Sequence, residues 1–244
     1  MNIVNITRTK NNIVKKSQQL LTSRYTLKPL EIKIITTLIS MIKVGDDKFK
    51  EYIFKVSDFQ QLREAKNQNI YTLIEELADG LLRKPVTIRS ENGDWLKANW
   101  VSSARYKKGE GHIIFKISDD LKPYLLALKE KFVQYKIENI LPLKSSYTIR
   151  LYELLKDWFV TQTRYDNSKS VSKIIEVSWL RKTFEIPESY NYADIKRNIL
   201  VKSKMQLLEH TDIKFTYEEI KTARRVTHLK FTIIDNQKNN NPHG

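Results

Sequence analysis

Cysteine is absent from this chain of 244 residues, which excludes disulfides, thiol nucleophiles and thiolate metal sites. Glycine and proline number only six each, so long disordered linkers are not expected. No stretch has the pattern of a secretory signal, and the most apolar window, Ile32–Ile42, is too short to span a bilayer and contains Lys33. These absences fit a protein of the reducing cytoplasm and predict no membrane partner.

Motifs for catalysis and for metal binding are also missing. No glycine-rich loop ends in Gly-Lys-Ser or Gly-Lys-Thr, which argues against nucleotide hydrolysis. The histidines are scattered and form no H-x-H or HExxH pair, which argues against a metal-dependent nickase or protease. The sequence therefore predicts that the protein is not an enzyme and that it holds no cofactor and no metal.

Basic residues are in clear excess, with 43 Lys and Arg against 28 Asp and Glu and a formal net charge of +15. The excess is spread over the chain: residues 1–135 hold 24 basic and 15 acidic residues, and residues 136–244 hold 19 and 13. A broad basic face favours a polyanionic partner such as nucleic acid over an acidic small molecule. A merely basic soluble protein is the simpler alternative on charge alone.

The hydrophobic periodicity predicts one order of elements twice: helix, strand, helix, helix, hairpin. In the first half we expect helices at Leu30–Ile42, Ser57–Arg63 and Asn69–Arg83, strands at Glu51–Val56, Val86–Arg89, Trp95–Ala104 and His112–Ile117, and a final helix at Asp119–Lys129. In the second half we expect helices at Ser146–Phe159, Trp179–Phe184 (capped by Ser178) and Tyr192–Glu209, a loop at Lys169–Ser172, and strands at Ile174–Val177, Asp212–Tyr217 and Thr227–Ile234.

A helix followed by a charged hairpin is the layout of a winged helix, in which the helix enters the DNA major groove and the hairpin contacts the backbone. The repeated order predicts an α+β fold of two tandem winged-helix domains, residues 1–135 and 136–244. The boundary is expected near Lys136–Lys144, where Pro142 interrupts the pattern.

The helix expected at Tyr192–Glu209 has the strongest signal for DNA recognition. Asn191 is its expected N-cap, with Asp194 at the capping-box position. Its inward stripe is expected to be Ile195, Ile199, Leu200, Ser203 and Leu207, and the polar residues off that stripe are Lys196, Arg197, Asn198, Lys202 and Lys204. Arg and Lys donate to guanine, and Asn pairs with adenine, so these residues predict base reading. A solvated helix face is the alternative.

Basic residues also occur where the hairpin tips are expected. Lys221, Arg224 and Arg225 lie in the connection Glu218–Arg225 and are expected to meet phosphates. In the first half, Lys66 and Asn69 stand before and at the start of the second helix, and Lys107 and Lys108 stand on a wing; that helix itself carries Glu75, Glu76 and Asp79, which repel phosphate. The first half is therefore predicted to make weaker backbone or minor-groove contacts and to offer a dimerisation surface.

Four stretches resemble plasmid replication initiators of the iteron-binding, Rep_3 or RepB type. They are LTSRYTLKPLEIKIITTLISMI (Leu21–Ile42), YKIENILPLKSSYTIRLYELLKDW (Tyr135–Trp158), YADIKRNILVKSKMQLLEHTDIKF (Tyr192–Phe215) and ARRVTHLKFTI (Ala223–Ile233). The resemblance extends over about residues 15–235 in the right order, and its most specific part is Ser146–Leu154.

The resemblance implies that the protein binds double-stranded DNA at the iterons of a plasmid origin. It implies that the monomer helps to open the duplex and recruits the host initiator and helicase, and that the homodimer represses the protein's own operator. The second winged helix is implied to read the main half-site through Lys196, Arg197 and Asn198, and the first to carry the dimer interface. Some relatives have an Arg-rich run where this chain has Asn198, which leaves the DNA sequence that is read open.

Three alternatives stand beside this interpretation. A winged-helix transcriptional repressor also binds DNA repeats but does not sustain a plasmid. A nicking replication enzyme needs a metal site and a tyrosine nucleophile, and no histidine pair accompanies any of the twelve tyrosines. A membrane-surface or RNA-binding module needs a lipid-like amphipathic stretch or an aromatic platform, and neither is visible.

Overall fold

The computed structural model describes residues 2–3, 11–43, 45–57, 59, 69–107, 109–126, 128, 131–166 and 168–236. The chain forms two compact units, Met1–Leu141 and Pro142–Gly244. The division falls inside the predicted segment Lys136–Lys144, but after residue 141 and not after residue 135. The reason is that the chain just beyond residue 135 still belongs to unit 1, where the amide of Ile137 donates to the carbonyl of Asn12 at 3.0 Å.

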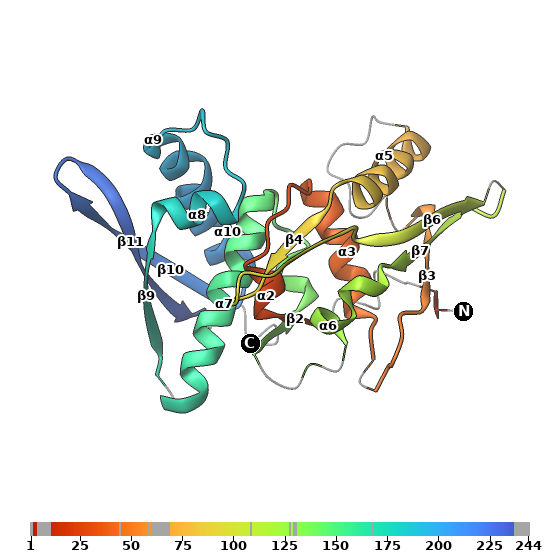
Figure 1. Ribbon diagram of the computed structural model, residues 1–244, viewed down its shortest axis with the longest axis horizontal. Helices are drawn as coiled ribbons and strands as arrows, with labels where there is room; N and C mark the ends of the chain where they lie inside the picture. Colours follow the sequence, from red (N-terminus) through yellow and green to blue (C-terminus); the bar gives the residue numbers. More distant parts are fainter. Residues whose placement is uncertain are drawn as a thin grey trace. The chain divides into compact units, whose positions relative to one another are not determined.

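Unit 1 combines short helices with three small sheets (Figure 1). Its helices are α2 (Gln18–Leu21), α3 (Pro29–Ser40), α5 (Ile70–Arg83), η1 (Asp119–Leu121), α6 (Lys122–Leu125) and η2 (Ile137–Asn139). Its strands are β1 (Asn2–Ile3), β2 (Ile13–Ser17), β3 (Glu51–Lys55), β4 (Val86–Arg89), β5 (Trp95–Ala98), β6 (Val101–Lys107), β7 (His112–Ile117) and β8 (Phe132–Lys136). The main sheet has the order β1-β3-β7-β6, while β2 pairs with β8 and β4 with β5.

Helix α3 is the central helix of unit 1, because every residue from Glu31 to Ser40 is buried. Its polar side chains find partners inside the fold, as buried polar groups must. Glu31 accepts from the amide of Lys28 at 2.6 Å and forms an ion pair with Lys84 of the α5 C-cap at 2.7 Å. The predicted helices at Leu30–Ile42 and Asn69–Arg83 are therefore confirmed, and a partly buried ion pair connects the first to the C-cap of the second.

Two predictions for unit 1 were wrong in their bounds. The strand expected at Trp95–Ala104 is two strands, since the chain turns inward at Trp100, which is 1% exposed and meets the ring of Tyr25 edge-on at 5.0 Å. The helix expected at Asp119–Lys129 ends at Leu125, where the backbone of the next residue becomes extended. The helix expected at Ser57–Arg63 lies largely outside the described residues.

The pair β2–β8 was not predicted. A lysine at a buried position hides the alternation of β2, because Lys16 is only 3% exposed and its ammonium donates to Thr36 of α3 at 3.2 Å. An analysis of hydrophobic periodicity expects a lysine to point outward, whereas the ammonium of Lys16 is hydrogen-bonded to Thr36 inside unit 1.

Unit 2 has the predicted order of helix, strand, helix, helix, hairpin. Its helices are α7 (Ser146–Asp166), α8 (Val177–Thr183), α9 (Tyr192–Ile195), the π-helical turn η3 (Lys196–Val201) and α10 (Lys202–His210), and its strands are β9 (Ser170–Glu176), β10 (Ile213–Thr222) and β11 (Arg225–Asp235). The three strands form one antiparallel sheet of order β10-β11-β9, so the long hairpin β10–β11 presents β10 at an edge.

Together α9, η3 and α10 form one continuous helical segment, called the basic helix below, and the long helix α7 holds this segment and the hairpin β10–β11 in place. The buried hydroxyls of Thr148 and Ser203 lie 2.9 Å apart and join α7 to α10. At the start of the hairpin, Asp212 accepts from the hydroxyl of Tyr152 at 3.0 Å and from Lys156 at 2.7 Å. Hydrogen bonds of this kind fix the helix relative to the sheet in a way that apolar contacts alone do not.

Several bounds in unit 2 differ from the prediction. Helix α7 continues to Asp166, and the expected loop Lys169–Ser172 is mostly strand β9. Helix α8 begins at Val177 with Glu176 as its N-cap, so Ser178 lies inside the helix and donates to Glu176 at 2.6 Å. The hairpin strands continue almost to the tip, because the chain pairs from Ile213↔Asp235 to Thr222↔Arg225. The segment Glu218–Arg225 is therefore strand more than loop.

Within the part of the chain that the structure describes, no helix combines the length and the apolar composition that crossing a membrane requires.

Replacing Gly80 with Ala tests the contact between α3 and α5. A methyl group at Gly80 lies 2.0 Å from Glu31 Oε1, so the side chain that pairs with Lys84 has to move. We expect Gly80→Ala to lower the free energy of unfolding by about 1–3 kcal/mol, as overpacking does, although alanine is the better helix former. Chemical denaturation measures the effect.

Thr72→Ala is the control, because Thr72 is exposed on the same helix and the change adds nothing near Glu31. A Gly80→Ala variant at least as stable as the native protein shows that the ion pair can move without cost.

Candidate nucleic-acid interface

The start of the basic helix has the predicted capping box. The Asn191 side chain accepts from the amide of Asp194 at 3.0 Å, and the Asp194 side chain accepts from the amide of Asn191 at 3.1 Å. Both hydrogen bonds satisfy backbone donors that the first helical turn leaves open. Asn191 was predicted both as the N-cap and as a DNA contact; the structure confirms the N-cap.

A π-helical turn separates the two halves of this helix. Residues Lys196–Val201 form η3, between α9 and α10. The wider turn lets Ile195, Ile199 and Leu200 all point inward, although an ordinary α-helix cannot align residues four and five apart equally well. All five residues of the predicted inward stripe are buried: Ile195, Ile199, Leu200, Ser203 and Leu207. π turns occur frequently at functional sites.

Lys196 is joined to the hairpin by an ion pair. Its ammonium lies 2.7 Å from Oε1 of Glu219 on β10, and the Lys196 side chain is 48% exposed against 23% for Glu219. The pair raises the pKa of Lys196 and lowers the pKa of Glu219, because each charge stabilises the other. Burial first, and then the Glu219 carboxylate, raise the pKa of the neighbouring Tyr192 hydroxyl. Lys196 therefore connects the helix and the hairpin.

The other side chains predicted to contact bases differ in their exposure and in their ion pairs. Arg197 is 71% exposed in its side chain, and its guanidinium lies 2.8 Å from the Asp194 carboxylate one turn earlier. Lys202 is exposed, and Asn198 is half-buried. An exposed Arg–Asp pair within one helix contributes little to stability, so a stronger acceptor can replace the aspartate at small cost. Arg197 and Lys202, like Lys204, are exposed on this surface.

The hairpin ends in a basic turn. Lys221, Arg224 and Arg225 are all exposed, and Ala223 and Arg224 form the turn, where Ala223 has a φ of 55°. A bulge between Ile220 and Lys221 twists the last part of the hairpin, which projects away from the helices of its own unit (Figure 1). The structure thus places these three predicted residues together at the end of an extended arm.

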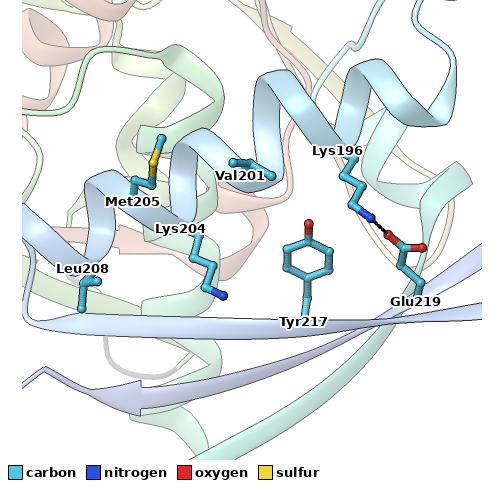
Figure 2. A pocket seen from close by; sticks show the side chains of 7 residues that line it. All are labelled: Lys196, Val201, Lys204, Met205, Leu208, Tyr217 and Glu219. Atoms are coloured by element: carbon cyan, nitrogen blue, oxygen red, sulfur yellow. Dashed lines mark ion pairs between the residues drawn. The ribbon is translucent and has the colours of Figure 1, made fainter.

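A hollow of about 690 Å³ lies between the helix and strand β10 (Figure 2). The helix side consists of Lys196, Val201, Lys204, Met205 and Leu208, and β10 contributes Tyr217 and Glu219. Sequence reasoning missed Glu219, Tyr192 and Tyr217 as parts of this surface. Residues two apart share a face of a strand, so the sequence could have placed Tyr217 and Glu219 on one face with Ile213 and Phe215. Glu219 was missed because it was assigned to a loop.

Two of the four predicted DNA contacts of unit 1, Asn69 and Lys107, lie in the described part of the chain and have partners within unit 1. Asn69 is the N-cap of α5, and its side chain accepts from the amide of Tyr71 at 2.9 Å. Lys107 ends strand β6, with its ammonium 3.3 Å from Glu110. Lys66 and Lys108 lie outside the described residues. Glu75 and Glu76 are exposed on α5 as expected, so this helix presents less positive charge than the basic helix of unit 2.

Among the described residues, no group of three His, Asp or Glu side chains is placed to hold a metal ion. His228 is a residue of strand β11, as predicted, and His112 lies 3.2 Å from Glu110 beside the unit 1 wing.

Two family models match the chain. Residues 13–156 match the model described as Initiator Replication protein, WH1, and residues 176–233 match the model described as Initiator Rep protein, WH2. These matches confirm the predicted resemblance and the α+β fold of two tandem winged helices. They also assign the basic helix and the hairpin to the second winged helix, because the helix and all but the last two residues of the hairpin lie within residues 176–233.

Curated relatives and a solved structure agree with the family models. A replication initiation protein of Escherichia coli is 26% identical over 191 residues, which are 76% of this chain and 57% of the relative. The PI protein of Escherichia coli is 28% identical over 170 residues, 63% of this chain and 53% of the relative. The chain thus spans little more than half the length of these relatives.

The crystal structure of the Pi initiator protein in complex with iteron DNA is similar in fold. The TM-score is 0.72 at 19% sequence identity, and the match covers 95% of this chain and 99% of that chain.

Replacing Asn191 with Ala tests whether this residue acts as a cap. Removing the side chain leaves the amide of Asp194 without its acceptor, so we expect Asn191→Ala to lower the free energy of unfolding by about 1 kcal/mol. Asn191→Asp and Asn191→Ser preserve an acceptor and should restore most of the stability in chemical denaturation. A loss of DNA affinity in all three variants, with unchanged stability, contradicts the capping role.

Proposed function

Because the chain belongs to the family of replication initiators that these two models describe, we propose that it binds double-stranded DNA sequence-specifically as a plasmid replication initiator. One observation carries the proposal. Unit 2 presents exposed Arg197 and Lys202 on a helix whose opposite face is buried, and the same unit extends a hairpin tipped by arginines. The formal net charge of +15 supports a polyanionic partner.

In this proposal the basic helix enters the major groove of an origin iteron. Arg197 and Lys202 donate to base edges, for which the guanine O6 and N7 acceptors are the best-matched targets. Asn198, half-buried in the π turn, contributes a contact to adenine, and Lys196 contributes when its pair with Glu219 opens. Asn191 holds the first turn in the helical conformation, so that its free amides face the DNA.

The hairpin contacts the backbone beside the groove. Lys221, Arg224 and Arg225 meet phosphates, which fixes the register of the helix but carries no sequence information. Neutralising six to ten phosphates over the whole protein makes affinity fall about a thousandfold or more between 50 and 200 mM salt.

Unit 1 makes the weaker, auxiliary contacts and carries the surface for homodimerisation. Lys66, Asn69, Lys107 and Lys108 are the residues assigned to its DNA contacts. The monomer binds iterons, helps to open the origin and recruits the host initiator and helicase, while the dimer binds the protein's own operator and represses it. The proposed activity is binding, without a catalytic step, in the cytoplasm of a bacterium.

Two experiments test the function. The first compares binding of the purified protein to a duplex carrying the repeats beside its gene with binding to a scrambled duplex, at physiological salt. A preference of about a thousandfold or more is expected, and equal weak binding overturns the proposal. The second asks whether the protein maintains a plasmid that carries those repeats. Specific binding without maintenance indicates a transcriptional repressor instead of an initiator.

Replacing Arg197 with Ala is expected to weaken binding to the repeat duplex by about 1–3 kcal/mol and to relax specificity at one base pair. Binding to scrambled duplex should change much less, because the proposed hydrogen bonds of the Arg197 guanidinium are to one particular base of the repeat. Titrations against both duplexes measure the ratio. Lys169→Ala is the control, since Lys169 is exposed at the end of the sheet opposite the hairpin tip. An equal decrease on both duplexes shows that Arg197 contacts phosphate only.

Removing both arginines of the hairpin tip, Arg224→Ala with Arg225→Ala, should weaken DNA binding without changing its sequence specificity. Affinity is expected to fall by a similar factor for repeat and scrambled duplexes, because phosphates are common to both. The slope of log affinity against log salt should become shallower by about 1 for each phosphate that the variant no longer neutralises. A salt slope equal to that of the native protein contradicts the placement of the tip on the backbone.

A further inference from the structure

The exposed face of the basic helix carries apolar side chains that take no part in the packing of its buried face. Val201 is 40% exposed and Met205 is 59% exposed, although the inward stripe of the same helix is complete without them. Both line the hollow beside β10 (Figure 2). Single exposed apolar residues are ordinary, but a group of them in one hollow usually marks a contact surface.

Val201 and Met205 lie in the same stripe as the basic readers. Val201 follows Arg197 by four residues, close to one turn of the wide helix η3, and Met205 follows Val201 by four residues, one turn of α10. Lys202 is adjacent to Val201 and is also exposed. The exposed stripe therefore alternates between charged and apolar side chains.

The spacing of the last three residues matches a known geometry of base recognition. Val201, Lys202 and Met205 stand at positions i, i+1 and i+4, as three base-contacting residues of homeodomain recognition helices do. In the major groove an apolar side chain has one natural target, the 5-methyl group of thymine, which no other standard DNA base carries. The neighbouring Lys204 is also exposed and suits the phosphate-lined walls of the groove.

We infer that Val201 and Met205 are specificity-determining residues that contact thymine 5-methyl groups in the DNA site. The inference rests on the proposed function, because it requires the basic helix to lie in the major groove. Lys202 between them donates to the polar edge of the same or a neighbouring base pair. The recognised site accordingly contains thymines at the positions that face these two side chains.

Deoxyuridine provides the test, because it pairs with adenine as thymidine does but lacks the 5-methyl group. Thymines of the repeat duplex are replaced one at a time, and the affinities of the native protein and of Val201→Ala, Met205→Ala and the double variant are measured. Native affinity is expected to fall about fourfold for each contacted methyl, the ratio expected for exposing one buried methyl group. The double variant should bind thymine and uracil duplexes equally.

Leu208→Ala is the matched control. Leu208 is 50% exposed and lines the same hollow, but it stands one turn beyond Met205. It should retain the full native sensitivity to uracil. All three positions are exposed, so the variants are expected to fold, and their thermal unfolding confirms this before binding is measured.

The outcomes separate the inference from the proposed function. If the native protein does not prefer the repeats over scrambled duplex, the proposed function fails. If it prefers them and the double variant retains the native ratio between thymine and uracil duplexes, the inference is overturned while the function stands. If the double variant binds both duplexes as the native protein does but cannot maintain the plasmid, this face contacts a protein partner, and the inference is again overturned.

Discussion

The surface of unit 2 that we propose to face DNA depends on the burial of one face of a single helix, formed by α9, η3 and α10. Ile195, Ile199, Leu200 and Leu207 are fully buried, and Ser203 among them is bonded to Thr148 of α7. The π turn η3 lies within this stretch and contains Ile199 and Leu200. With the inner face fixed in this way, other side chains of the helix, among them Lys196, Val201 and Met205, line the hollow beside β10.

Carboxylates accompany the basic residues of this surface. Asp194 holds Arg197, and Glu219 holds Lys196, at N–O distances of 2.8 and 2.7 Å. Exposed ion pairs of this kind are worth at most about 1 kcal/mol, so a phosphate or a base edge can replace either carboxylate at little cost. In the free protein these pairs restrain the long side chains of Arg197 and Lys196 near the helix.

Sequence periodicity predicted the order of elements in unit 2, the capping box at Asn191 and the inward stripe of the basic helix, because these follow from local spacing. It did not predict β2, since Lys16 is buried through a bond to Thr36, or the length of β10, since charged residues continue along that strand almost to the tip. The same error concealed Glu219, whose role depends on a helix distant in sequence. The cap at Asn69 was missed although Asn is a typical N-cap residue, because the predicted helix was begun at Asn69 itself.

We propose that the basic helix and the hairpin of unit 2 bind one DNA site together. Hydroxyl-radical footprinting of the protein on the repeats beside its gene tests this most directly. The account predicts a protected segment with additional backbone protection at its flank, and it predicts that only the flank becomes unprotected when Arg224 and Arg225 are replaced by alanine. A footprint that this double variant leaves unchanged, or the absence of any footprint with the native protein, would contradict it.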